Sequence, residues 1–149
     1  MISGVIKWID IPPVWLIGFM VLASATTGFE PLWPELIWFG RILILLGIFL
    51  ILWAAVAFRR ARTTIIPKQR PSALVDSGPF KYSRNPIYLA DLLILAGWSI
   101  SHGLTVASGA TFALLFVLEW RFIRKEEDVL EADLGQPYLD YKARVRRWI

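Results

Sequence analysis

Two short polar segments of this chain carry the side chains that could do chemistry. The first, residues 78–88, places Arg84, Asn85 and Tyr88 around a Gly-Pro bend and a helix start at Pro86. Backbone N–H groups at a helix start favour anions, so this segment is a candidate binding site. Taken alone, it could equally be structural. Arg84 would then be a topology anchor, Asn85 a helix cap and Tyr88 an interface aromatic.

The second polar segment, residues 121–127, mixes charges of both signs. Adjacent Glu126 and Glu127 cannot share one helix face, so at least one of them can point back over the preceding helices. The alternative is a solvated helix held by internal ion pairs, since Arg124 lies at helical spacing from Glu127. The second segment therefore becomes informative only together with the first.

Composition indicates an integral membrane protein with one domain. Of 149 residues, 56% are hydrophobic and 19% are charged, which is too apolar for an ordinary soluble domain. The chain has no Cys and a single His, His102, so we expect no disulfide, no thiolate nucleophile and no metal site. The formal charge of +4 comes from cations that flank apolar segments. We therefore expect a lipid bilayer, and no nucleic acid, as the partner.

Four apolar segments are predicted to be membrane helices. Residues 12–29 and 35–58 are each long enough to cross a hydrocarbon core of ~30 Å, at ~1.5 Å per residue. Residues 86–100 and 104–119 form a shorter hairpin around a turn at 101–103. We expect the first segment to stay in the mature protein and not to be cleaved as a signal peptide. The prolines between residues 59 and 85 exclude a long helix there, and this connection must lie outside the hydrocarbon.

The distribution of positive charge predicts the orientation. Of the 16 Lys and Arg residues, only Arg41 does not fall at one and the same membrane face, which is therefore cytoplasmic. Both termini and both polar segments should lie at this face, in a bacterial inner membrane. Residues 132–149 mix aromatic residues with arginines and are predicted to form an interfacial helix there. Because the hairpin returns the chain to its starting face, the two polar segments should be neighbours.

Three other residue types invite a functional interpretation. Asp91 lies inside the third membrane segment, where an ionisable side chain is costly and marks a candidate functional site, unless it reaches Arg84 or interfacial water. His102 lies at the opposite turn, so it is a poor candidate base. The tryptophans are typical interface anchors, with Trp98 and Trp120 as candidates for lining a pocket.

At these residues the chain resembles the integral-membrane methyltransferases that include isoprenylcysteine carboxyl methyltransferase and the phospholipid N-methyltransferases. The matching elements are Leu74-Val75-x-x-Gly78-Pro79-Phe80, Arg84-Asn85-Pro86-x-Tyr88, Glu126-Glu127-x-x-Leu130 and Leu134-Gly135-x-x-Tyr138-x-x-Tyr141. They follow one another in the family's order and spacing. The resemblance implies one methyltransferase domain over residues 1–149, with generic membrane helices at 12–58 and a cofactor-binding core at 63–147.

The resemblance implies S-adenosylmethionine as the methyl donor, bound at the cytoplasmic face. It assigns contacts with this cofactor to Ser72, Ala73, Leu74, Val75, Gly78, Phe80, Asn85, Pro86, Ile87, Tyr88 and Glu126. The candidate catalytic residues are Arg84, Arg121 and Glu127. Many isoprenylcysteine enzymes have His where this chain has Asn85, and the family's substrate arginine falls one residue from Arg121. The acceptor is therefore left open.

Methyl transfer from a sulfonium is an in-line displacement, so catalysis consists chiefly of positioning and of control of charge. An ionised carboxylate acceptor needs only a cation such as Arg121 to orient it. An amine or thiol must also lose a proton, to Glu127 or to water. We expect transfer to a lipid-like or small hydrophobic acceptor, most like isoprenylcysteine carboxyl O-methylation. The alternatives are N-methylation of phosphatidylethanolamine, and a non-catalytic membrane subunit that docks a partner protein.

Overall fold

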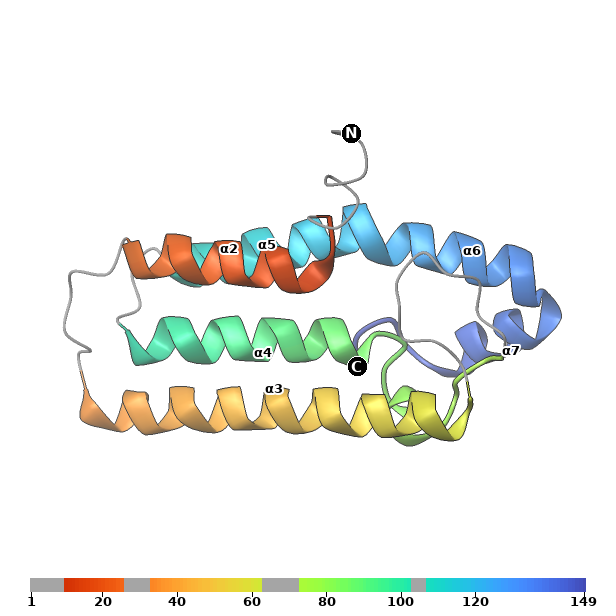
Figure 1. The fold of residues 1–149 in the computed structure, drawn as a ribbon, viewed down its shortest axis with the longest axis horizontal. Helices are drawn as coiled ribbons and strands as arrows, with labels where there is room; N and C mark the ends of the chain where they lie inside the picture. Colours follow the sequence, from red (N-terminus) through yellow and green to blue (C-terminus); the bar gives the residue numbers. More distant parts are fainter. Residues whose placement is uncertain (1–9, 26–32, 63–72, 103–106) are drawn as a thin grey trace.

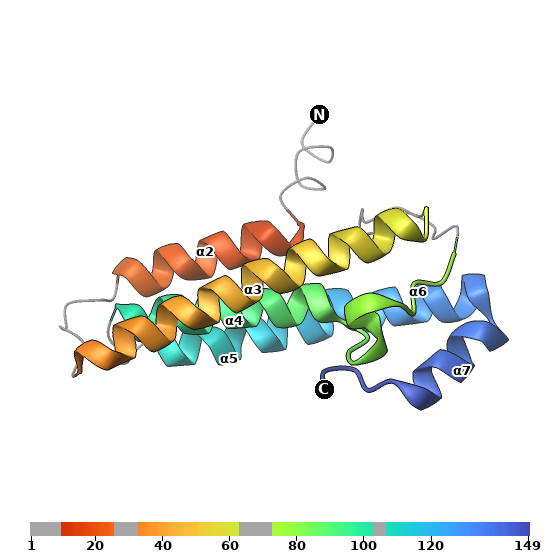
Figure 2. The ribbon, with the colours of Figure 1, turned by 90° about the horizontal axis from the view of Figure 1, so that it is seen from below.

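The computed structural model describes residues 10–25, 33–62, 73–102 and 107–149, and these residues form helices and connecting turns. The elements are α2 (Pro12–Ala25), α3 (Pro34–Arg60), the 3₁₀ turn η1 (Gly78–Lys81), α4 (Pro86–Ser101), α5 (Ala107–Val117), the π-helical segment η2 (Leu118–Ile123), α6 (Arg124–Leu134) and α7 (Gln136–Arg144). Figures 1 and 2 show α2, α3, α4 and α5 side by side along one axis, with α6 and α7 beyond the N-terminal end of α4. The helical fold agrees with the sequence.

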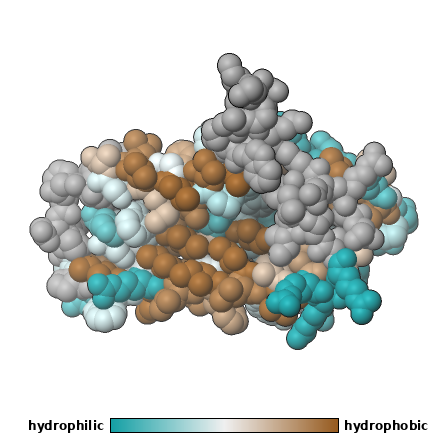
Figure 3. Space-filling view, viewed as in Figure 1, coloured by the Kyte–Doolittle hydropathy of each residue, from teal (hydrophilic) through white to brown (hydrophobic). Residues whose placement is uncertain are grey.

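Within the described ranges, one helix is long and apolar enough to cross a membrane, namely Glu35–Arg60. Its most apolar window has a mean hydropathy of 2.6 and is only 17% buried, so most of its apolar side chains face outward. The helices Pro12–Ala25 and Pro86–Ser101 are apolar but shorter. Figure 3 shows hydrophobic residues gathered over the middle of the bundle on one face. This surface is typical of a protein in contact with lipid.

Helices α3 and α4 approach closely because glycines face one another across their contact. A Cβ atom built on Gly40 would lie 2.5 Å from the carbonyl oxygen of Gly97, and one built on Gly97 would collide with the carbonyl oxygen of Gly40. Further along, a Cβ on Gly47 would lie 2.8 Å from the carbonyl oxygen of Ala90. Small residues allow this approach, and the resulting backbone contact fixes where α4 begins relative to α3.

Two clusters of buried apolar side chains hold the elements together. The larger lies between α4, α5 and η2 and consists of Tyr88, Leu92, Leu95, Ala110, Leu114, Leu118, Phe122 and Ile123, with side chains of α2 packed against it. The smaller joins the end of α3 to η1 and consists of Ala54, Ala57, Val75 and Phe80. The larger cluster therefore joins the two polar segments through Tyr88 and Phe122, and the smaller holds Phe80 of the first segment.

The second half of the chain differs from the prediction in two places. The fourth apolar segment does not end at residue 119, since α5, η2 and α6 form one uninterrupted helical run that passes through a π turn. The predicted helix at 132–149 is broken at Gly135, where φ is +57°, and α7 ends at Arg144. Glycine accepts this backbone conformation without the strain that a side chain would bring. Residues 145–149, the C-terminal tail, are not helical.

Candidate functional site

The two polar segments meet at the start of α4. The hydroxyl group of Tyr88 donates a hydrogen bond of 2.7 Å to Oε1 of Glu126. The guanidinium group of Arg84 lies 3.3 Å from Oε1 of Glu127. The two adjacent glutamates thus turn to different partners, as their neighbouring positions on a helix require. The rings of Tyr88 and Phe122 pack with their centroids 6.5 Å apart. This contact holds the helical turn that precedes the two glutamates against the start of α4.

The C-terminal tail closes this site from a third side. The Arg147 guanidinium donates to both carboxylate oxygens of Glu127, at 3.1 Å from Nε and 2.5 Å from Nη2. It also donates to the Glu119 carboxylate through Nη1. The Glu127 hydrogen bonds are the largest influence that raises the pKa of Arg147. This arginine therefore stays charged and clamps two acidic side chains that lie about two turns apart on one helical run.

The main chain of the tail is also held by hydrogen bonds. The backbone carbonyl of Arg147 accepts hydrogen bonds from Ser83 Oγ at 3.3 Å and from Asn85 Nδ2 at 3.1 Å. The backbone N–H of Arg84 donates to the carbonyl of Arg146 at 2.9 Å. Asn85 has the position of a helix cap, but its side chain makes no capping hydrogen bond. Its interpretation as a side-chain cap was therefore wrong, because the amide is used to hold the tail.

Arg147 and Glu119 are not among the site residues that the sequence predicts. The sequence pattern predicts that the tail arginines contact the membrane surface, which is the usual role of a basic end. The aromatic residues of α7 were assigned to the same interface, yet Tyr138 and Tyr141 are 1% and 3% exposed. The Tyr141 hydroxyl donates to the carbonyl of Phe80 at 2.8 Å. Burial, followed by the charge of Glu127, raises the pKa of Tyr138 to about 12. These tyrosines are internal supports of the site.

The residues expected to contact the cofactor differ in how deeply they are buried. Ser72 lies outside the described residues. Ala73, Leu74, Gly78 and Ile87 are half-buried, whereas Val75, Phe80, Asn85, Pro86 and Tyr88 are buried. Val75 and Phe80 pack into the smaller apolar cluster, where the Phe80 ring meets Phe58 edge-on at 5.3 Å. Gly78 has φ of +62° and passes close to Trp53, which explains why a glycine begins this turn.

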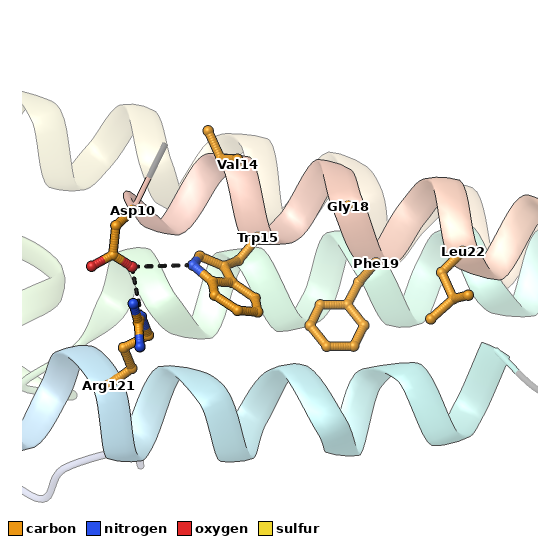
Figure 4. Close-up of a pocket in the computed structure, with 7 residues that line it drawn as sticks. All are labelled: Asp10, Val14, Trp15, Gly18, Phe19, Leu22 and Arg121. Atoms are coloured by element: carbon orange, nitrogen blue, oxygen red, sulfur yellow. Dashed lines mark hydrogen bonds and ion pairs between the residues drawn. The ribbon is translucent and has the colours of Figure 1, made fainter. Parts of the chain in front are cut away.

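Arg121 does not point toward Arg84, contrary to the expectation that the second segment faces the first as a unit. Its Nε donates to Oδ1 of Asp10 at 2.6 Å, and its guanidinium lies 5.6 Å from the ring centre of Trp15. Figure 4 shows Arg121 directed at α2. The next residue, Phe122, packs on Tyr88, so the preceding side chain must turn about a quarter of the helix circumference away.

The remaining candidates lie apart from this site or inside the helices. Asp91 is 3% exposed, and its Oδ2 has no hydrogen-bond partner among the described residues. His102 stacks on Trp98 at the opposite end of α4, with ring centres 4.3 Å apart, which agrees with its exclusion as a base. Trp120 stacks on the Arg124 guanidinium at 3.6 Å. The tryptophan that lines the groove of Figure 4 is Trp15, and neither Trp98 nor Trp120 does so.

Comparison with known proteins decides the family. The family model for phospholipid methyltransferases matches residues 36–136, which include both polar segments. The chain belongs to this family. The motif resemblance is thereby confirmed, and the family's activity is methyl transfer. The matched range ends before the C-terminal tail and begins after α2, so Arg147 and Asp10 lie outside it.

An uncharacterised protein of Haemophilus influenzae is 36% identical to the chain over 63 residues. These residues are 42% of this chain and the whole of that protein. No solved structure matches the chain.

Proposed function

We propose that this chain is an S-adenosylmethionine-dependent methyltransferase that modifies a lipid-like or small hydrophobic acceptor at the cytoplasmic membrane face. The observation that carries the proposal is the meeting of the two polar segments in a member of this family. Tyr88 binds Glu126, and Arg84 pairs with Glu127, across 38 and 43 residues of sequence respectively. These pairs join the start of α4 to α6, where the motifs imply the donor site.

We propose that α2, α3, α4 and the α5–η2 run all lie in the membrane, with α6, α7 and both termini at the cytoplasmic face of a bacterial inner membrane. The outward apolar surface of α3 supports this arrangement. The position of α6 and α7 beyond the N-terminal end of α4 supports this arrangement as well (Figure 1). Their charged side chains would then lie at the headgroups or in water. Cysteine labelling at position 77 but not at position 101 from the cytoplasmic side would test this topology.

The side chains at this site fit the polar end of the donor. Arg84 is nearly buried, and its Nε and Nη1 have no hydrogen-bond partner among the described residues. Buried, unpaired guanidinium donors are costly, so an anionic group such as the carboxylate of S-adenosylmethionine would satisfy them. The Glu126 carboxylate supplies negative charge for the ammonium or sulfonium group, whereas Glu127 is already paired with Arg84 and Arg147. When bound, S-adenosylmethionine supplies an electrophilic methyl group.

The side chains of the chain itself act by positioning and by charge. Tyr88 holds the Glu126 carboxylate through its hydrogen bond, and Arg147 holds Glu127, so neither carboxylate needs to reorganise when a cation binds. An ionised carboxylate acceptor would need orientation only, which Arg121 offers. An amine acceptor would need a base, for which Glu127 is the nearest candidate. The family's name, phospholipid methyltransferase, supports phosphatidylethanolamine as the second candidate acceptor.

Calorimetric titration of the detergent-purified protein with S-adenosylmethionine tests the proposal. We expect saturable binding by the wild type and strongly weakened binding by Glu126→Gln and Arg84→Gln. Glu131→Gln is the matched control, because Glu131 lies on α6 but pairs with Lys142, away from α4. Absence of saturable binding by the wild type would refute the proposed function. Transfer of a radiolabelled methyl group then separates the acceptors, since a methyl ester is base-labile and a methylated amine is not.

A further inference from the structure

Asp91 is the acidic residue of α4, and its side chain lies inside the helix bundle. It is 3% exposed, and its Oδ2 atom has no hydrogen-bond partner among the described residues. Arg84 does not supply one, because it pairs with Glu127 and its Nε and Nη1 atoms are also without a partner there. Burying an unpartnered carboxylate is costly, and inside a membrane segment such a residue marks a candidate functional site.

The helical spacing of α4 places Asp91 between the donor site and α2. Asp91 follows Tyr88 by three residues, so the two side chains leave the helix about 60° apart. The charge of Asp91 acts electrostatically on the Tyr88 hydroxyl group, as that of Glu126 does. Two turns further along nearly the same line, Trp98 donates a hydrogen bond of 3.1 Å to Ser24 of α2. The carboxylate therefore lies next to Tyr88, on the side of α4 that faces α2.

Asp91 also lies deeper in the bundle than the two adjacent glutamates. It is five residues beyond Pro86, the first residue of α4, which is about 7.5 Å along the helix axis. The helix that carries Glu126 and Glu127, α6, lies beyond the N-terminal end of α4 (Figure 1). Under the proposed topology, a donor that binds at these glutamates from water has Asp91 on its membrane side. A lipophilic acceptor would approach the methyl group from that side.

The other carboxylates of the site are already held by partners. Both oxygens of Glu127 accept hydrogen bonds from Arg147, which also pairs with Glu119. Glu126 is held by a tyrosine hydroxyl group, and the proposed function assigns it to the cation of the donor. A base needs an oxygen that is free to accept the proton it removes. Of these four carboxylates, Asp91 is the one that no cation or hydroxyl group holds among the described residues.

We propose that Asp91 is the base of the methyl transfer, an inference that rests on the proposed function. The bond between the attacking atom of the acceptor and its hydrogen breaks, and the proton moves to Oδ2 of Asp91. The electron pair that remains on the attacking atom forms the bond to the methyl carbon. The S–CH₃ bond of the donor breaks, and its electron pair stays on sulfur. The attacking atom is therefore a nitrogen or sulfur that carries a proton, and not the oxygen of an ionised carboxylate.

Thermal unfolding in detergent tests whether Asp91 contributes to the fold or to the reaction. Asp91→Val should raise the unfolding midpoint by about 2–4 °C, because an apolar side chain replaces an unpartnered buried carboxylate. Ser99→Ala is the control and should not raise it, since Ser99 is 2% exposed on the same helix but has an interaction partner. An unchanged or lower midpoint for Asp91→Val would show that the carboxylate stabilises the fold, and would overturn the proposal.

Single-turnover transfer of a radiolabelled methyl group tests the chemical step. The protein in nanodiscs, saturated with S-adenosylmethionine, receives phosphatidylethanolamine, an alkane thiol or a prenylated cysteine with a free carboxylate. Asp91→Asn should lower the rate with the amine or the thiol about 100-fold or more, and Asp91→Glu should restore most of it. An unchanged rate in Asp91→Asn, or an equal loss with the carboxylate, would overturn the proposal. Wild-type protein that methylates neither the amine nor the thiol would overturn it as well.

Titration with S-adenosylmethionine separates this proposal from the one on which it rests. Asp91→Asn should bind the donor with unchanged affinity, because the donor contacts are proposed at Arg84 and Glu126. Weakened donor binding would make Asp91 a donor-binding residue and would overturn its role as the base. Wild-type donor binding with an unchanged transfer rate in Asp91→Asn would leave the proposed function standing. Absence of donor binding by the wild type would overturn the proposed function itself.

Discussion

The side-chain amide of Asn85 donates a hydrogen bond of 3.1 Å to the backbone carbonyl of Arg147. This bond joins the residue before α4 to the C-terminal tail, across 62 residues of sequence. The Arg147 side chain continues from the same point to Glu127 and Glu119. The tail is therefore a structural part of the candidate site.

Replacing Arg147 with Ala should destabilise the protein by about 2 kcal/mol, because Glu127 is 5% exposed and would keep only Arg84 as a charged partner. The measurement is the thermal unfolding midpoint in detergent. Arg146→Ala is the control, since the side chain of Arg146 is exposed and its hydrogen bond to Arg84 uses the backbone. Equal midpoints for the two variants would contradict the clamp.

Replacing Tyr88 with Phe removes the hydroxyl that binds Glu126 and keeps the ring that packs on Phe122. We expect affinity for S-adenosylmethionine to fall about tenfold, with little change in the unfolding midpoint. Tyr82→Phe serves as the comparison, because Tyr82 is 68% exposed. If Tyr88→Phe bound the donor as tightly as the wild type, the hydrogen bond would have no part in donor binding.

Replacing Gly97 with Ala should separate α3 from α4, because the added Cβ would collide with the backbone carbonyl of Gly40. Backbone cannot move aside as a side chain can, so we expect a loss of about 2 kcal/mol or more. The same substitution at Gly109 meets no atom within 4 Å. It should be neutral or slightly stabilising, since alanine favours helix more than glycine does. Unfolding midpoints of the two variants measure the difference.

Stability should fall as the pH rises from about 10 to 12, in part because of Tyr138. Burial raises the pKa of this tyrosine from 10.0 to about 12. The contribution is complete below pH 10, where both states are protonated, and is lost above it, because the unfolded chain ionises first. Tyr138→Phe should show a smaller loss of stability over this interval when unfolding midpoints are compared at pH 9 and pH 12. An identical loss in both proteins would assign the effect to other groups.

The meeting of the two polar segments could be predicted from the hairpin, because a chain that turns once returns to the face it left. The direction of Arg121 could not be predicted, because the π turn at Leu118–Ile123 shifts the helix faces and no residue type announces it. The role of Arg147 was hidden for another reason. Its tail is held largely through backbone carbonyls, which every residue has, so the sequence there carries no pattern beyond positive charge.

The π turn also shifts the residue spacing of the inward-facing side between α5 and α6. The buried residues Leu114 and Leu118 precede most of this wider turn, and the two adjacent glutamates follow it. Deleting one residue within 118–123 would restore α-helical spacing and leave the glutamates facing Tyr88 and Arg84, because the wider turn accommodates the extra residue. The π turn thus shifts the sequence spacing of the buried face by about one position, so the apolar pattern before the turn does not give the inward-facing positions after it.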